Sequence, residues 1–590
     1  MLQQAQDYLK KYFGYTSFRK GQDQIIANII AGKDTLGIMP TGGGKSICYQ
    51  IPALIFPGIT IVISPLISLM KDQTDTLTAL GIPATFINST LSQGEVNQRL
   101  GQADDGRYKL LYIAPERFES ELFFSWIRSL PISMFAIDEA HCISQWGHDF
   151  RPSYQTIASV IEALPNRPII SAFTATATPE VIRDIETILD LKGNTFITGF
   201  QRENLVYSVV RGENKRDVVL QVLEDNPDQS GIIYASTRKE VQLLYDFLLL
   251  KGYRAGMYHG GMNEQERERN QDQFIYDEIQ VMVATNAFGM GIDKSNVRFV
   301  IHYNLPKNME AYVQEAGRAG RDGEPSQCIL LFHPQDIQIQ KFLIEQSVSH
   351  EERKKQEYEK LQIMVDYCHT QQCLSNYILQ YFGETGHEEC GTCSNCSEES
   401  ELVDRTIEAQ KVFSCIVRMQ ERYGVTMIAK VLKGSLDKKL LQFRLHHLST
   451  YGLLKQHTEK EISDFIHWLV AEDYLMLAGG KFPIVKLRPP AKAVLLRQES
   501  VYRKVRKRKQ VFAQDEVLFQ HLRELRKQLA EEAQVPPYVI FADSTLREMC
   551  ESLPGNRMDM LNVKGVGEVK YEKYGAQFLA VIQSYLQEHP

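Results

Sequence analysis

Short apolar runs alternate with longer polar or amphipathic segments from residue 30 to about residue 200. The runs are DTLGIMP, TIVISP, KLLYIAP, MFAIDEA and IISAFTAT. Runs that are apolar throughout are typical of strands buried on both faces of a parallel sheet, and the segments between them are typical of covering helices. The first part of the chain is therefore predicted to be an α/β domain.

The same alternation begins again after residue 205, with the runs SGIIYAS, RAGMYHG, IQVMVAT, VRFVIHYNLP and CILLF. Two α/β lobes are predicted. In both, polar residues follow the apolar runs, at the strand ends where open α/β sheets bind their ligands. We expect the two lobes to share one cleft.

Beyond about residue 340 the pattern becomes mainly helical, with a β-like IVKL near residue 487 that suggests a short hairpin. A basic run, VYRKVRKRKQ at residues 501–510, precedes a last segment that is helical throughout. The predicted units are a first lobe at 1–205, a second lobe at 206–340, a helical module at 341–402, a helical domain at 403–500, a basic linker at 501–512 and a helical domain at 513–590.

Composition narrows the class of protein. A chain of 590 residues suggests three to five domains of roughly 150 residues each. A net charge of -7 argues against a protein that coats nucleic acid uniformly, although a local basic channel is compatible with it. The N-terminus lacks a basic segment followed by an apolar one, and no apolar run is long enough to span a membrane. We expect a cytoplasmic protein that does not contact membranes.

Three motifs predict a nucleotide site. MPTGGGKS at residues 39–46 follows a predicted strand and precedes a predicted helix, as a phosphate-binding loop does. Backbone N–H groups of Thr41, Gly42, Gly43 and Gly44 would surround phosphate oxygens, Lys45 would reach the β- and γ-phosphates, and Ser46 would bind Mg²⁺. The first position of the motif is Met39 rather than glycine, and a glycine-rich turn without a ligand is the alternative.

The second motif is Asp138-Glu139-Ala140-His141, after the strand MFAI. Asp138 is expected to hold Mg²⁺, Glu139 to polarise the attacking water and His141 to report the state of the γ-phosphate. The third motif is QEAGRAGRDG, in which Arg318 and Arg321 lie three residues apart in the second lobe. They are suited to gripping a triphosphate held by the first lobe, with Arg321 favoured as the arginine finger. A solvated acidic turn and a basic surface loop are the alternatives.

Four of the ten cysteines have metal-ligand spacing. Cys373, Cys390, Cys393 and Cys396 form the pattern C-x16-C-x2-C-x2-C, and four thiolates can close a tetrahedral Zn²⁺ site. Free buried thiols and an iron–sulfur cluster are the alternatives. The cluster is disfavoured because the usual Cys-Pro continuation is absent.

The lobes resemble superfamily 2 helicases, and specifically the RecQ family of DNA helicases. The resemblance rests on the three motifs and on FGYTSFRKGQ at 13–22, SPLISLMKDQ at 64–73, YIAPERF at 112–118, SAFTATAT at 171–178, IIYASTRK at 232–239 and VATNAFGMGIDK at 283–294. It implies that Gln22 contacts the adenine edge, with Tyr15 or Arg19 near the base.

The rest of the chain is similar to the same family. YILQYFGE at 377–384 resembles its zinc segment, residues 404–490 with HHLSTYGLLK resemble its winged-helix module, and residues 513–590 resemble its HRDC domain. The implied fold class is α/β, with two RecA-like parallel-sheet lobes followed by a helical zinc-binding module, a winged-helix domain and a small all-α HRDC-like domain. Lys564, Lys570, Lys573, Tyr571 and Tyr574 mix cations with aromatic rings, which suits a surface that binds single strands. The alternatives are a solvated helix face at these residues and a purely structural helical domain at 404–490.

ISQWGHDFRP at 143–152 begins two residues after His141 and is too polar and broken for simple core packing. It resembles the aromatic-rich loop of RecQ helicases, which implies coupling of strand binding to hydrolysis. The residues expected to contact DNA or to transmit its binding are Gln145, Trp146, His148, Phe150 and Arg151. The alternative is that Trp146 and Phe150 only anchor the loop.

The predicted function is an ATP-dependent DNA helicase, with a 3′-to-5′ polarity and a role in DNA repair and recombination implied by the resemblance. Expected cofactors are ATP, Mg²⁺ and Zn²⁺, and expected partners are single-stranded and branched or tailed duplex DNA, with a single-strand-binding protein as a candidate. We expect a monomer, associated with the nucleoid if the source is bacterial. An RNA-remodelling ATPase of the same superfamily and a non-hydrolytic scaffold for branched DNA are the alternatives.

Overall fold

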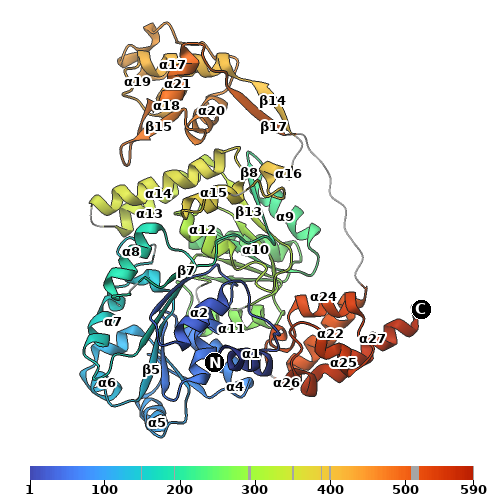
Figure 1. Cartoon of the computed structure of the whole chain (residues 1–590). Helices are drawn as coiled ribbons and strands as arrows, with labels where there is room; N and C mark the ends of the chain where they lie inside the picture. The colour runs from blue at the N-terminus through green and yellow to red at the C-terminus, as the bar shows by residue number, and fades with distance from the viewer. Residues whose placement is uncertain are drawn as a thin grey trace.

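The computed structural model describes residues 1–147, 149–191, 193–289, 294–348, 351–386, 388–397, 400–506, 517–533 and 535–588. They form two α/β lobes, a helical module with four cysteines, a helical domain with a β-hairpin and a C-terminal helical domain (Figure 1). This arrangement confirms the predicted fold class. Among the described residues, no helix is both long and apolar enough to cross a membrane.

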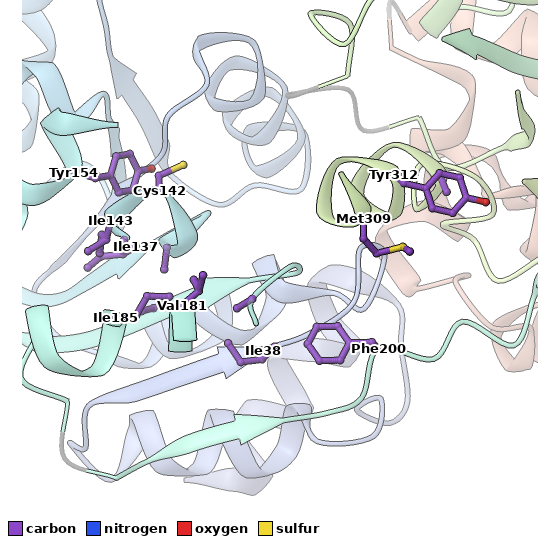
Figure 2. Packing of buried hydrophobic residues seen from close by; sticks show 14 of the residues in the cluster. Ile38, Ile137, Cys142, Ile143, Tyr154, Val181, Ile185, Phe200, Met309 and Tyr312 are labelled. Carbon is purple, nitrogen blue, oxygen red and sulfur yellow. The ribbon is translucent and has the colours of Figure 1, made fainter. Parts of the chain in front are cut away.

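The first lobe contains a seven-stranded parallel sheet in the order β3-β4-β2-β5-β6-β1-β7. Successive strand residues point to opposite faces: Ile61 and Phe135 belong to one buried cluster, and Val62 and Ala136 belong to another. Figure 2 shows Ile137, at the end of β5, near Ile143 in the first of these clusters. Because helices cover both faces, the strands are apolar throughout.

The elements of the first lobe are α1 (Leu2–Tyr8), η1 (Leu9–Phe13), α2 (Gln22–Ile30), β1 (Thr35–Ile38), α3 (Lys45–Ile55), β2 (Ile59–Ile63), α4 (Ile67–Ala79), β3 (Ala84–Ile87), α5 (Gln93–Asp104), β4 (Leu110–Ile113), η2 (Pro115–Glu119), α6 (Glu121–Ile127), β5 (Ile132–Ile137), η3 (Ala140–Ile143), α7 (Pro152–Glu162), β6 (Ile169–Thr174), α8 (Pro179–Ile188) and β7 (Thr195–Ile197).

The second lobe contains a six-stranded parallel sheet in the order β10-β11-β9-β12-β13-β8. Its elements are β8 (Leu205–Arg211), α9 (Lys215–Asp225), β9 (Ser230–Tyr234), α10 (Arg238–Leu250), β10 (Ala255–Tyr258), α11 (Glu264–Ile275), β11 (Val281–Ala284), β12 (Val297–His302), α12 (Met309–Ala316), β13 (Ser326–Phe332) and α13 (Pro334–Ser347).

A long helix, α14, connects the second lobe to the domains that follow it, because it packs against α12 and α13 of that lobe and also against α20 of the next domain. The helical module is α14 (Glu351–His369), α15 (Leu374–Tyr381) and α16 (Ser394–Ser397). The next domain is β14 (Ser400–Asp404), α17 (Thr406–Arg418), α18 (Val425–Lys433), α19 (Lys438–Gln442), η4 (Leu445–His447), α20 (Glu459–Ala471), β15 (Leu475–Ala478), β16 (Ile484–Leu487), α21 (Pro489–Leu495) and β17 (Tyr502–Arg506). The antiparallel pair β15–β16 is the predicted hairpin.

The basic run does not begin as a linker. Strand β17 pairs antiparallel with β14 over five residues, and the guanidinium of Arg503 lies 5.9 Å from the ring of Phe465 and 5.3 Å from that of Trp468. Backbone pairing and these cation–π contacts hold the first half of the run to the preceding domain. Residues 507–512, the rest of the predicted linker, lie outside the described residues, as do residues 513–516.

The C-terminal domain packs its helices around its own apolar cluster, which includes Leu522, Phe541 and Phe578. It lies beside the two lobes in Figure 1. Its elements are α22 (Val517–Ala533), α23 (Pro537–Ile540), α24 (Asp543–Ser552), α25 (Arg557–Asn562), α26 (Glu568–Lys570), η5 (Tyr571–Gly575) and α27 (Ala576–Glu588).

Candidate functional site

The glycine-rich loop joins β1 to α3, and Lys45 is the first residue of that helix. Gly42 and Gly44 have φ angles of 78° and 79°, in the left-handed region that side chains disfavour. The loop therefore wraps around the N-terminus of α3, where backbone N–H groups and the helix dipole favour an anion.

The segment before α2 holds the loop from the side. The Gln22 amide donates to the carbonyl oxygens of Gly43 and Gly44 at 3.2 and 3.1 Å, and Arg19 donates to that of Gly42. The backbone N–H of Arg19 donates to the Gln22 side chain at 2.8 Å. Because these donors bind loop carbonyls, they support its shape as well as lining the cleft beside it.

Asp138 and Glu139 follow β5 on the same edge of the sheet as the loop. Glu139 has a φ angle of 48°, a strained conformation of the kind that recurs at functional sites. Burial and the adjacent Glu139 raise the pKa of Asp138, while Lys45 opposes that shift. Burial also disfavours ionisation of Glu139, but the nearby His141 and Lys45 lower its pKa. His141 Nδ1 lies 3.2 Å from Glu139 and 2.9 Å from the hydroxyl of Thr174 on β6.

The two arginines of the second lobe follow α12. Arg318 is buried and donates to the carbonyl of Gly289. Burial lowers the pKa of Arg318, and the negative charge of Glu139 on the first lobe opposes this. Arg321 lies against the glycine loop: its Cα is 3.3 Å from the position that a Cβ on Gly42 would occupy. The arginines of one lobe therefore face the loop and carboxylates of the other.

One cavity of about 540 Å³ collects these side chains. Residues from both lobes line it: Tyr15, Arg19, Gln22, Thr41, Gly42, Gly44, Lys45, Ser46, Asp138, Glu139, Arg318 and Arg321. Gly43 lies within the same loop, and His141 lies behind Glu139. An anion-binding loop, buried carboxylates and facing arginines are the groups that binding and hydrolysis of a nucleoside triphosphate require.

The aromatic loop leaves the same edge of the first lobe. Gln145 and Trp146 are exposed, Trp146 to 50%, whereas Phe150 and Arg151 are half-buried. Arg151 donates to the carbonyl of Pro65 at 2.8 Å, so this side chain fastens the loop to the first lobe. His148, also expected in this group, lies outside the described residues.

The sulfur atoms of Cys373, Cys390, Cys393 and Cys396 all lie within 4.8 Å of one another. Backbone N–H groups approach three of them: that of Cys390 donates to Cys373 Sγ, that of Cys393 to Cys390 Sγ and that of Leu374 to Cys393 Sγ, at 3.3, 3.3 and 3.4 Å. Such N–H groups stabilise thiolates. Four sulfur donors in one cluster fit a closed, structural Zn²⁺ site.

Comparison with known proteins agrees with a nucleotide-hydrolysing cleft and a zinc site. The ATP-dependent DNA helicase RecQ of Bacillus subtilis (strain 168) is 52% identical over 587 residues, which cover 99% of each chain. This chain belongs to the RecQ family of ATP-dependent DNA helicases. The helicase RecQ of Haemophilus influenzae is 40% identical over 596 residues, covering 98% of this chain and 96% of that protein.

Family models match this RecQ-family helicase along its length. The matches are a DEAD/DEAH box helicase at 19–185, a helicase conserved C-terminal domain at 214–323, RecQ zinc-binding at 334–397, an RQC domain at 399–511 and an HRDC domain at 515–582. The zinc-binding match contains all four clustered cysteines.

A residue that joins the phosphate loop to the second lobe was not predicted from the sequence. Arg202 lies in the connection between the lobes, and its guanidinium donates to Thr41 O of the phosphate loop and to Ala319 O and Gly320 O beside the arginines, the last two at 3.0 and 2.7 Å. It therefore ties the two halves of the helicase cleft together. A single arginine outside any glycine-rich or acidic motif carries no local signal of this role.

The HRDC domain completes the wall of the cleft. Gly567 packs against Gly14, and Arg547 forms an ion pair of 2.6 Å with Glu324 of the second lobe. Lys564 and Lys570 line the cavity, and burial lowers the pKa of Lys570 to about 8. In this arrangement, two of the three lysines that the sequence assigned to a strand-binding surface, Lys564 and Lys570, face the nucleotide cleft, whereas Lys573 is exposed.

Proposed function

We propose that this RecQ-family helicase moves 3′ to 5′ along single-stranded DNA and displaces the complementary strand as it hydrolyses ATP. The observation that carries the proposal is the shared cavity, in which Lys45, Asp138 and Glu139 of one lobe face Arg318 and Arg321 of the other. Hydrolysis that needs groups from both lobes depends on how the lobes close, and repeated closure moves the lobes along a strand.

The residues of the cavity divide the work of binding and hydrolysing ATP among them. Lys45 and the N–H groups of the loop bind the phosphates, Ser46 and Asp138 hold Mg²⁺, and Glu139 accepts a proton from the attacking water. Buried adjacent carboxylates beside a hydroxyl suit this cation. Arg321 and Arg318 stabilise the charge that develops on the γ-phosphate, and His141 keeps Glu139 ionised. Gln22, with Tyr15 and Arg19, selects the base.

The aromatic loop makes hydrolysis depend on the strand. Trp146 is exposed and can therefore stack on a base. It lies only five residues after His141, which contacts Glu139, so a change in the loop can reach the hydrolytic site through a short stretch of chain. Stacking of a base on an aromatic ring is worth roughly 1–3 kcal/mol, enough to select one loop conformation. We further propose that the protein acts as a monomer in the cytoplasm, in DNA repair and recombination, with a single-strand-binding protein as partner.

The test is strand displacement on 3′-tailed, 5′-tailed and blunt DNA, with and without ATP. We expect unwinding of the 3′-tailed substrate only, and only with ATP and Mg²⁺. Lys45→Ala should abolish hydrolysis while DNA binding remains, whereas Glu139→Gln should bind ATP without turnover. Preference for the 5′ tail would refute the polarity, and equal unwinding of an RNA duplex would refute the specificity for DNA.

A further inference from the structure

A lysine outside both lobes joins the aromatic loop to the helix that precedes the arginines. Lys360 Nζ lies 2.7 Å from the carboxylate of Glu310 on α12, and it also donates to the backbone carbonyl of Trp146 at 3.2 Å. Lys360 is on α14, the first helix of the zinc-binding module. One ammonium group therefore connects a loop of the first lobe, a helix of the second lobe and the module that follows.

In the second lobe, Lys360 contacts a buried carboxylate, that of Glu310. Glu310 is 2% exposed, and a carboxylate so far from water is unfavourable without a nearby cation. It stands in the first turn of α12, whose last turn leads directly to Arg318 and Arg321. Met309 and Tyr312 of the same helix are buried (Figure 2). Because α12 has only eight residues and ends two residues before Arg318, a small shift of the helix at Glu310 also moves the arginines.

On the side of the first lobe, the contact depends on loop conformation. The acceptor is the main-chain oxygen of Trp146. This hydrogen bond therefore forms only when the loop holds that peptide toward α14, whatever the orientation of the indole. Two turns earlier on the same face of α14, the guanidinium of Arg353 lies 5.9 Å from the ring of Phe150. Helix α14 thus contacts both aromatic positions of the loop, one through its backbone and one through its ring.

We propose that Lys360 is a positioning residue that transmits strand binding from the aromatic loop to the arginines. When bases stack on the loop, the peptide of Trp146 changes its position. The hydrogen bond from Lys360 to the Trp146 carbonyl then changes, and so does the ion pair between Lys360 and Glu310. Helix α12 then moves relative to the phosphate loop, which changes how Arg318 and Arg321 meet the γ-phosphate. This inference rests on the proposed coupling of the loop to hydrolysis and names the side chain that carries it.

The direct test is Lys360→Met, which keeps most of the apolar stem and removes the charge. We expect the ratio of single-strand-stimulated to unstimulated kcat for ATP hydrolysis to fall about tenfold, as for loss of a charge-assisted hydrogen bond. The KM for ATP should change less than about twofold, because Lys360 does not line the nucleotide cavity. Lys360→Arg, which keeps a cation, should restore most of the stimulation. Lys355→Met, at an exposed lysine of the same helix, is the matched control and should behave as wild type.

A second variant separates coupling from stability, because Lys360→Met leaves the Glu310 carboxylate buried without its cation. Lys360→Met/Glu310→Gln removes that charge, so its Tm should return toward wild type while stimulation stays low. Wild-type stimulation in Lys360→Met, or recovery of both Tm and stimulation in the double variant, would overturn the inference. If the wild-type enzyme itself shows no stimulation by single strands, the proposed coupling fails before Lys360 is considered.

Discussion

Replacing Arg202 with methionine should slow hydrolysis by loosening the contact between the phosphate loop and the arginines. The change removes every hydrogen bond of the guanidinium while keeping a side chain of similar length. Gly320 O retains a donor, the amide of Asn204 at 2.9 Å, but Thr41 O and Ala319 O lose the charged donor that joins them. Each hydrogen bond to a charged group is worth about 1.5–3 kcal/mol. Because Arg202 is half-buried, water replaces part of the loss, and the net effect on the closed cleft is about 2 kcal/mol.

That value corresponds to about a 30-fold lower kcat at saturating ATP and single-stranded DNA. Burial lowers the pKa of Arg202, yet an arginine stays charged at neutral pH, so the loss should not depend on pH between 6 and 8. The kcat of Arg202→Lys should lie between those of the wild type and Arg202→Met, because an ammonium cannot reach all of the carbonyls. Arg183→Met, at an exposed arginine, is the control. A kcat for Arg202→Met within about threefold of wild type would refute the reasoning.

Three further predictions concern other parts of the chain. Elemental analysis should find about one Zn²⁺ per chain, and Cys393→Ser should lower soluble yield and DNA binding before it affects nucleotide binding; iron, or no metal, would contradict the site. Burial lowers the pKa of His467 to about 4 and that of its neighbour His369 well below its usual value, so protons bind preferentially to the unfolded chain. The destabilisation caused by protonating these two histidines is therefore absent above about pH 6.5 and grows as the pH falls toward 4; Tm should drop between pH 7 and 5, and by less in His467→Leu. Trp146→Ala and Phe150→Ala should each reduce the stimulation of hydrolysis by single strands, and wild-type stimulation in both would return these rings to a structural role.

Local spacing was enough to predict most of the fold and of the candidate site. Strands that are buried on both faces appear in the sequence as apolar runs. Three further features each lie within about a dozen consecutive residues: the glycine loop, the acidic pair after β5 and the two arginines. The edge strands β3, β7 and β8 were not predicted. Each is only partly buried, so its sequence contains no continuous apolar run.

Contacts between distant segments were decided only by the tertiary structure. Arg202 bridges residues more than a hundred positions away in sequence, Lys360 meets Trp146 across 214 positions, and Lys570 turns toward the cleft because the HRDC domain docks there. The composition of residues 502–506 likewise predicts a basic linker, but these residues form strand β17, which pairs with β14. The sequence by itself determined which chemical groups the protein carries, since motifs arise from neighbouring residues. Which of those groups meet is set by how the domains pack, and no local pattern records that packing.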